Sequence, residues 1–197
     1  TQRRANHDGE VSPISVQIAG ADPDMLAAAA RYNMEQGAQI IDINMGCPAK
    51  KVTGGYSGSA LMRDLDHALT LIEATVQAAS VPVTLKMRLG WDDQTVNAPE
   101  LARRAQDAGI QMITVHGRTR CQFYEGKADW DAVGAVREAV TVPLDVNGDV
   151  VDAKAALEAL QASGADAVMA GRAHYGRPWF AGMLAKGDAD ERPAGLD

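Results

Sequence analysis

Cysteine is scarce in this chain of 197 residues, which contains only Cys47 and Cys121. A disulfide framework is therefore not expected, and this usage is typical of a reducing compartment. No apolar run approaches the roughly 20 residues that a membrane-spanning helix needs. The first residues include two arginines with no apolar segment behind them, so they do not predict a signal peptide. We expect a cytoplasmic protein without a membrane segment.

The chain also lacks an excess of positive charge. Its formal net charge is −7, whereas a dedicated nucleic-acid-binding protein is normally basic. A local basic patch is compatible with this balance, because net charge and charge distribution are separate properties. The four histidines are dispersed, and none lies at ligand spacing with a carboxylate or a thiolate. We therefore expect no metal site.

Short apolar runs alternate with alanine-rich amphipathic segments along the sequence. The apolar runs predict six buried parallel strands, and these are Ile14–Ala19, Ile40–Asn44, Val83–Met87, Met112–His116, Leu144–Asn147 and Ala167–Ala170. Each intervening helix is expected to begin after an N-cap residue. The candidate caps are Asp22, Asp64, Asn97, Asp129 and Asp152. Three of these helices are expected to stop at glycine, at Gly37, Gly109 and Gly164.

This alternation favours a barrel over an open doubly wound sheet. No G-x-G-x-x-G follows the first strand, and polar residues gather where strands end, as barrel active sites require. A full barrel has eight βα units and roughly 250 residues. The predicted fold is therefore α/β, an incomplete TIM (β/α)8-type barrel with about six units. We expect residues 1–10 to be poorly ordered, residues 11–185 to form the partial barrel and residues 186–197 to form a tail.

The segment Ile41–Pro48 predicts a buried strand that runs into a sharp turn carrying Cys47. Gly46 allows the backbone to bend, and a proline after the cysteine cannot continue a ladder of hydrogen bonds. A thiol at such a strand end is a candidate for chemistry. The alternative is a buried structural cysteine, which is the commoner situation for an isolated motif. Cys121 is interpreted as structural or incidental.

Other polar side chains fall within or at the end of apolar strands. Gln17 is either a hydrogen-bonded core amide or a contact to a planar ligand. Lys86 and Arg88 alternate, so they share one face of their strand. A charged lysine in a barrel interior is costly unless an anion lies beside it, and this anion is either a protein carboxylate or an anionic cofactor.

Three more strand ends are followed by glycine and charged residues. His116 precedes Gly117 and two arginines, which favours a loop built for a negatively charged partner over a purely structural histidine. The turns Asn147-Gly148-Asp149 and Gly171-Arg172 follow the last two strands, where barrels often hold a phosphate. Two ordinary βα turns are the alternative.

On these residues the chain resembles the tRNA-dihydrouridine synthases, in particular the bacterial B-type branch. The resemblance runs from about Val11 to Trp179. Its most specific part is the cysteine motif Asp42-Ile43-Asn44-Met45-Gly46-Cys47-Pro48. The other matching motifs are Val16–Gly20, Lys86–Trp91, His116–Thr119, Val146–Asp149 and Gly171–Ala173.

The resemblance implies an FMN-dependent oxidoreductase that reduces a uridine of tRNA at its C5–C6 bond, with NADPH as reductant. It implies that Cys47 donates the proton to C5 and that Asn44 contacts the uracil edge. The implied flavin contacts are Gln17, Lys86 and His116, and the implied phosphate contacts of FMN are Asn147, Gly148, Asp149, Gly171 and Arg172. The implied contacts to tRNA phosphates are Lys50, Lys51, Arg118, Arg120 and Arg177.

The resemblance also implies that the first two strands of the family's barrel and its C-terminal helical domain are absent from this chain, which does not begin with methionine. We therefore expect this polypeptide alone to bind FMN weakly or not at all, and to be inactive or weakly active. Two alternatives are a flavin barrel that acts on a small pyrimidine and a non-catalytic RNA-binding barrel remnant. The sequence leaves the oligomeric state open.

Overall fold

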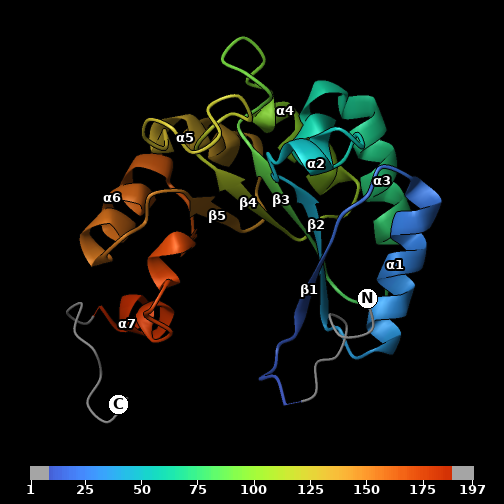
Figure 1. Ribbon diagram of the computed structural model, residues 1–197, viewed down its shortest axis with the longest axis horizontal. Coiled ribbons are helices and arrows are strands. Elements are labelled where there is room, and N and C mark those ends of the chain that lie inside the picture. The colour runs from blue at the N-terminus through green and yellow to red at the C-terminus, as the bar shows by residue number, and fades with distance from the viewer. Residues whose placement is uncertain (1–8, 188–197) are drawn as a thin grey trace.

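A computed structural model describes residues 9–187, which form a six-stranded parallel sheet with helices between the strands (Figure 1). The strands follow one another in chain order across the sheet. They are β1 (Ser15–Ile18), β2 (Ile40–Met45), β3 (Val83–Arg88), β4 (Met112–His116), β5 (Leu144–Asn147) and β6 (Ala167–Met169). This architecture confirms the predicted α/β fold, an incomplete (β/α) barrel. The bounds of β4 and β5 are those expected, and the other strands shift by one residue at one or both ends.

Five longer helices connect the strands and cover one face of the sheet (Figure 1). They are α1 (Pro23–Glu35), α3 (Leu65–Ala78), α4 (Ala98–Asp107), α5 (Trp130–Ala139) and α6 (Ala153–Ser163). Four of the five predicted N-caps accept a backbone hydrogen bond, and these are Asp22, Asp64, Asp129 and Asp152. Such a cap is worth about 1 kcal/mol of stability, because it satisfies an amide that the helix leaves without a partner.

Asn97 is the predicted N-cap residue that does not form a capping hydrogen bond to α4. Instead, the Asn97 amide donates to the carbonyl oxygen of Met62, 2.8 Å away. Asn97 therefore joins the start of α4 to the short helix η2 (Gly58–Arg63), which the sequence did not predict. Three other short helices were also missed, and they are α2 (Lys50–Thr53), η3 (Arg172–His174) and α7 (Phe180–Lys186).

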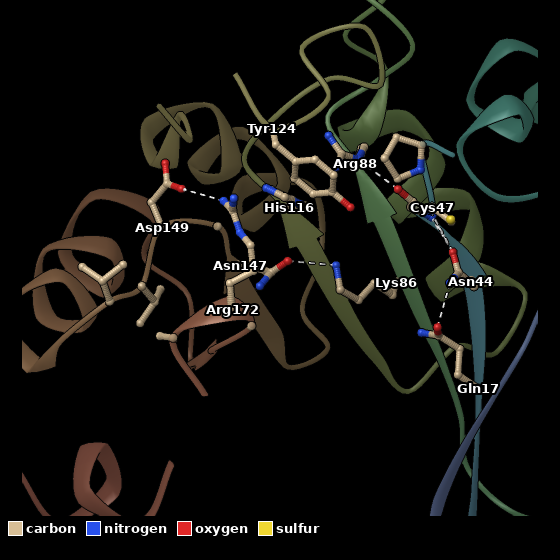
Figure 2. Close-up of a pocket in the computed structure, with 17 residues that line it drawn as sticks. Gln17, Asn44, Cys47, Lys86, Arg88, His116, Tyr124, Asn147, Asp149 and Arg172 are labelled. Atoms are coloured by element: carbon tan, nitrogen blue, oxygen red, sulfur yellow. Dashed lines mark hydrogen bonds and ion pairs between the residues drawn. The ribbon is translucent and has the colours of Figure 1, made fainter. Parts of the chain in front are cut away.

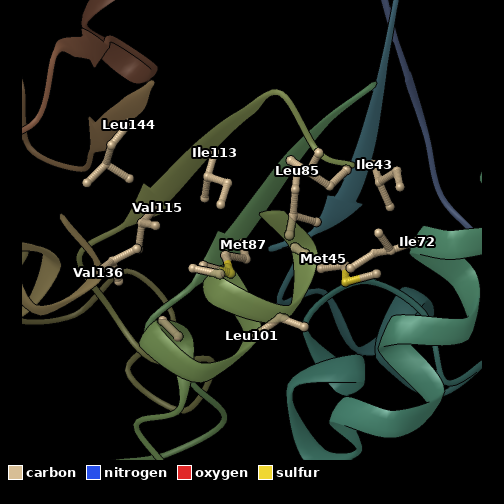
Figure 3. Packing of buried hydrophobic residues seen from close by; sticks show 14 of the residues in the cluster. Ile43, Met45, Ile72, Leu85, Met87, Leu101, Ile113, Val115, Val136 and Leu144 are labelled. Carbon is tan, nitrogen blue, oxygen red and sulfur yellow. The ribbon is translucent and has the colours of Figure 1, made fainter. Parts of the chain in front are cut away.

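The apolar core lies between the sheet and the covering helices (Figure 3). Ile43, Leu85 and Ile113 come from neighbouring strands and are at most 1% exposed. Burying an aliphatic side chain of this size contributes about 1.5–3 kcal/mol. Ile72 from α3 and Leu101 from α4 fill the helix side of the same layer. The alternation of side chains along each strand then sends the intervening residues to the opposite face.

The apolar runs predicted buried strands, but this opposite face of the sheet carries polar side chains. Gln17 pairs in register with Asp42, and Asn44 pairs with Lys86. No helix among residues 9–187 is long and apolar enough to cross a membrane. The predicted N-terminal segment and C-terminal tail fall largely on residues 1–8 and 188–197, which lie outside the described residues.

Candidate active site

A cavity of about 660 Å³ lies at the carboxyl ends of the strands. Figure 2 shows side chains from β1 through the turn after β6 pointing toward it. Ten of the residues predicted from the sequence line this cavity, and they are Gln17, Asn44, Cys47, Lys86, His116, Asn147, Gly148, Asp149, Gly171 and Arg172. A volume of this size is typical of a cofactor or small-molecule site. The structure therefore brings together residues from nearly the whole described chain, from Gln17 to Arg172.

A continuous row of hydrogen bonds connects the floor of the cavity to the cysteine turn. The Gln17 amide donates to Asp42 Oδ2 at 2.6 Å, and Thr84 Oγ1 donates to Asp42 Oδ1 at 2.7 Å. Asn44 Nδ2 donates to Gln17 Oε1 at 2.7 Å, while Asn44 Oδ1 accepts from the backbone N–H of Cys47 at 2.9 Å. An ionised carboxylate can only accept hydrogen bonds, so the Gln17 side chain must turn its NH₂ group toward Asp42 and its oxygen toward Asn44.

The turn that carries Cys47 is held from three sides. Asn44 Oδ1 also accepts from the N–H of Gly46 at 3.0 Å, and Ser59 Oγ donates to the carbonyl of Cys47 at 2.9 Å. The buried Arg88 donates through Nε to the carbonyl of Gly46 at 2.9 Å. The backbone around the thiol is therefore rigid, and the half-buried Cys47 side chain faces the cavity.

Lys86 extends from β3 into the middle of the cavity (Figure 2). Its Nζ donates to Asn147 Oδ1 at 3.0 Å, and Asn147 Nδ2 donates to the carbonyl of Met169 at 2.7 Å. The pKa of Lys86 is lowered from 10.5 to about 8. Burial is the main cause, and the positive charge of Arg88 lowers the pKa further, while the negative charge of Asp42 raises it. An ammonium has three donors. Within residues 9–187 Lys86 uses one of them, which leaves capacity for an acceptor on a bound molecule.

Arg118 does not face the cavity. Arg118 is 1% exposed, and its guanidinium donates to the carbonyls of Glu125 and Gly126, at 3.0 Å and 2.8 Å. It also forms an ion pair with Asp149 at 2.6 Å. The guanidinium is therefore occupied by partners within the protein, and a contact between Arg118 and a tRNA phosphate stays a prediction.

The two turns expected to hold a phosphate lie on the same wall of the cavity. Gly148 has a φ of +112° and Asp149 a φ of +57°, so this turn uses the left-handed region at two consecutive residues. The Asp149 carboxylate points to Arg118, to the N–H of Ala128 at 2.8 Å and to Arg172 at 3.7 Å. The charge of this carboxylate disfavours direct contact with phosphate. At this wall the exposed Arg172 and the backbone near Gly171 are the groups suited to an anion.

Four cations predicted to contact tRNA lie outside the cavity lining. Lys50 and Lys51 are exposed on α2, directly after the cysteine turn. Arg120 lies over the ring of Trp91 at 4.8 Å. Arg177 donates to the carbonyl of Ala173 and lies over Phe180. These residues stay candidates for contacts to a large substrate that extends beyond the cavity.

Two lining residues with polar side chains, Arg88 and Tyr124, were not among the predicted site residues. Arg88 lies beside Cys47, and its alternation with Lys86 along β3 was the available signal. Tyr124 comes from the loop after β4 and is 48% exposed. Its ring lies 5.6 Å from the Arg88 guanidinium and 5.1 Å from that of Arg172. No local pattern marks a lone tyrosine in a loop, so the sequence could not identify it.

Replacing Gly148 by alanine is expected to damage the cavity wall. A Cβ at this position would lie 2.8 Å from the His116 Cδ2 and 2.8 Å from the Ala128 Cβ, and its backbone would be strained at a φ of +112°. We expect Gly148→Ala to lower the free energy of unfolding by about 1–3 kcal/mol, as overpacking typically does. Urea unfolding measures this change. Gly182→Ala is the control, since no atom lies within 4 Å of a Cβ at that position. Its free energy of unfolding should be unchanged or slightly higher.

Parallel βα units that direct a thiol, an ammonium and glycine turns toward one strand-end cavity are typical of the (β/α) barrel class of proteins. The sequence model of the dihydrouridine synthase family (Dus) matches residues 1–195. The chain therefore belongs to the dihydrouridine synthase family.

Several curated relatives carry the same family name. A probable tRNA-dihydrouridine synthase of Rhizobium leguminosarum bv. phaseoli is 65% identical over 180 residues, covering 91% of this chain and 56% of the relative. One from Rhodobacter capsulatus is 58% identical over 94% of this chain and 58% of its own length. tRNA-dihydrouridine synthase B of Xanthomonas axonopodis pv. citri is 53% identical over 92% of this chain and 55% of its own length. The chain spans about half the length of the curated relatives it matches.

Solved structures give a likeness of fold alone. The L-Ala-D/L-Glu epimerase of Bacillus subtilis superposes with a TM-score of 0.56 at 21% identity, over 79% of this chain and 37% of the epimerase. The dipeptide epimerase of Enterococcus faecalis gives a TM-score of 0.54 at 16% identity, again over 79% and 37%. At such low identity the shared arrangement of strands and helices carries no information about activity.

Proposed function

We propose that the full-length protein, meaning this chain with any flanking segments that its gene encodes, reduces a uridine in tRNA to 5,6-dihydrouridine. The observation that carries this proposal is the convergence of Cys47 and Lys86 on one cavity, in a chain of the dihydrouridine synthase family. FMN is the proposed cofactor and NADPH the proposed reductant. Because tRNA is the proposed substrate, we assign the reaction to the cytoplasm. The small-pyrimidine and non-catalytic alternatives gain no support from the relatives.

The residues of the cavity fit FMN. Lys86 has donor capacity to spare in the middle of the cavity, where it suits an electron-rich heterocycle. Gly171 and Arg172 lie at the wall after β6, where a glycine backbone and an exposed guanidinium suit a phosphate. Reduced FMN bound here would supply a hydride to C6 of the uracil. Lys86 would stabilise negative charge on the cofactor through Coulomb attraction in a poorly solvated site.

Cys47 is the proposed proton donor to C5 of the uracil. A thiol can deliver this proton, whereas a thiolate cannot, so the protonated form of Cys47 is the working one. The rigid turn fixes where the thiol lies, because Asn44, Ser59 and Arg88 hold the backbone on both sides of it. Addition of the hydride at C6 and of the proton at C5 accounts for both hydrogens of the product.

Asn44 is proposed to contact the uracil edge, but its amide already makes hydrogen bonds. Nδ2 donates to Gln17, and Oδ1 accepts from the N–H groups of Gly46 and Cys47. Its second Nδ2 hydrogen is the group that can still reach a base. A uridine within folded tRNA would have to leave its stack to enter the cavity. Lys50 and Lys51 lie next to the cysteine turn, where they could meet the phosphates that flank an extruded base.

The proposal is tested with unmodified tRNA transcript, FMN and NADPH. We expect the full-length protein to form dihydrouridine in tRNA and to leave free uridine unchanged, because free uridine lacks the phosphate contacts. Raising the salt concentration should weaken tRNA binding steeply. Reduction of free uridine at the same rate as tRNA would favour a small-pyrimidine enzyme instead.

The 197-residue chain by itself is expected to retain little flavin. Strands β1 and β6 each have a neighbour on one side only, and such edges leave backbone donors and acceptors unpaired. Gln17 of β1 is exposed, so this side of the proposed flavin site is open to solvent in the described residues. The measurement is the ratio of flavin absorbance to protein after purification in the presence of FMN. A stoichiometric yellow protein with normal turnover would show this expectation wrong.

A further inference from the structure

Behind the wall of the cavity, three side chains form a row of direct contacts. His116 ends β4, Arg118 follows two residues later, and Asp149 comes from the turn after β5. Asp149 Oδ2 accepts from Arg118 Nη2 at 2.6 Å. Arg118 Nη1 lies 3.2 Å from His116 Nε2. The row therefore connects a carboxylate, a buried guanidinium and one nitrogen of an imidazole that lines the cavity.

The Arg118 guanidinium cannot accept a hydrogen bond, because all its polar atoms are donors and it keeps its proton in proteins. The two carbonyls of Glu125 and Gly126, together with Asp149, fix its plane. The His116 nitrogen that faces Arg118 must then be the acceptor. In a neutral imidazole one nitrogen accepts and the other carries the proton. The proton of a neutral His116 is therefore on Nδ1.

The charges that surround His116 keep the ring neutral. Arg88 and Lys86 of β3 and Arg118 of the β4 loop all face it, and Asp149 is the acidic group opposing them. Burial is the largest influence, and with these cations it lowers the pKa of His116 from 6.5 to about 3. At physiological pH the ring carries no charge.

Packing determines which edge of the ring reaches the cavity. Gly148 lies against the edge formed by Cδ2 and Nε2, where a Cβ would come within 2.8 Å and 3.0 Å of these atoms. Among residues 9–187 no group forms a hydrogen bond with His116 Nδ1, and Nδ1 is not among the buried polar atoms that lack a partner, so it is exposed. Because His116 lines the cavity, a molecule bound there is the partner that Nδ1 can meet.

We propose that Arg118 and Asp149 are positioning residues that hold His116 as the neutral tautomer protonated on Nδ1. His116 then offers the cavity one hydrogen-bond donor and no charge. The partner is an acceptor atom of the bound molecule, such as a carbonyl oxygen or a ring nitrogen. The tautomer follows from the contacts of this chain alone, while its use in catalysis rests on the proposed function.

The tautomer is measured directly by long-range proton–nitrogen NMR on protein labelled with ¹⁵N-histidine, without flavin or tRNA. The signals of His116 are assigned by their loss in His116→Gln, or by elimination with single replacements of the other histidines. We expect a protonated, pyrrole-type Nδ1 and a pyridine-type Nε2, with no change between about pH 6 and about pH 8, because the ring stays neutral. A proton on Nε2, or an imidazolium at pH 6, would overturn the proposal.

Two variants test the cause of the tautomer. Arg118→Met removes the donor that faces Nε2, so we expect part of the His116 population to move its proton to Nε2. Arg172→Met is the matched control, because Arg172 also lies near Asp149, at 3.7 Å, but makes no hydrogen bond to His116. It should leave the spectrum of His116 unchanged. Retention of the Nδ1–H form alone in folded Arg118→Met would contradict the role of Arg118.

If Arg118→Met does not fold, the spectrum of the unmodified protein still decides the tautomer. Asp149→Asn then tests the rest of the row, since it removes the charge that holds Arg118 and should broaden or shift the His116 signals. Unchanged signals in Asp149→Asn would remove Asp149 from the proposal. None of these results depends on dihydrouridine formation, so a failure of the proposed function leaves them interpretable.

Discussion

Replacing Cys47 by alanine is expected to lower the rate of uridine reduction in tRNA by about 10²–10⁴-fold, the usual contribution of a positioned proton donor. Flavin binding should not change, because the Cys47 backbone holds the turn and its side chain makes no hydrogen bond among residues 9–187. Reduction of the bound flavin by NADPH should also proceed at the normal rate. The measurement compares the two half-reactions in stopped-flow experiments with the full-length protein.

Cys121→Ala is the matched control for this prediction. Cys121 is the other cysteine of the chain, and its exposed side chain lies outside the cavity lining. Its replacement should leave both half-reactions unchanged. Equal activity of Cys47→Ala and Cys121→Ala would exclude Cys47 as the proton donor, even if tRNA is still reduced.

Replacing Lys86 by methionine is expected to change stability and cofactor binding in opposite directions. Burial disfavours the charged ammonium, as the lowered pKa of about 8 shows, so the unliganded protein should become more stable to urea below pH 8. FMN affinity should fall by about 10- to 150-fold, since a hydrogen bond to a charged group is worth about 1.5–3 kcal/mol. Flavin fluorescence titration measures the affinity.

Lys51→Met is the control, because it removes an exposed lysine outside the cavity and should change neither quantity. A Lys86→Met protein that is less stable and binds FMN normally would show that Lys86 has a structural role only.

The pKa of Lys86 also predicts a pH dependence with a definite sign. The native state loses this proton near pH 8, whereas the unfolded state keeps it until about 10.5. The destabilising contribution of the charged lysine is therefore present in full below pH 8 and decreases as the pH rises toward 10.5. FMN affinity should be constant just below pH 8 and should fall by up to tenfold per pH unit above it. The same slope in Lys86→Met would assign the titration to another group.

The sequence predicted the elements and the strand-end residues because both are local properties. Alternating apolar runs and N-caps identified β4, β5 and most helices to within a residue or two. A parallel barrel brings the carboxyl ends of all its strands to one side, so the sequence alone could assign Cys47, Lys86 and Gly171 to one cavity.

The contacts that the sequence did not predict concern side chains whose partners are distant in sequence. Asn97 was expected to cap α4, but the carbonyl of Met62, 35 positions earlier, receives its amide. Arg118 was assigned to a contact with tRNA phosphate, and its ion pair with Asp149, 31 positions later, could not be read from the sequence. Both residue types have several possible partners, and only the packed structure selects one.

The most direct test is a crystal structure of the full-length protein with FMN. We predict that the flavin ring system lies against Lys86 and that the FMN phosphate lies near Gly171 and Arg172. Cys47 should face the space in which a uracil would stack on the flavin ring. Electron density for FMN at any other place, with the cavity between Cys47 and Lys86 empty, would contradict the proposed function.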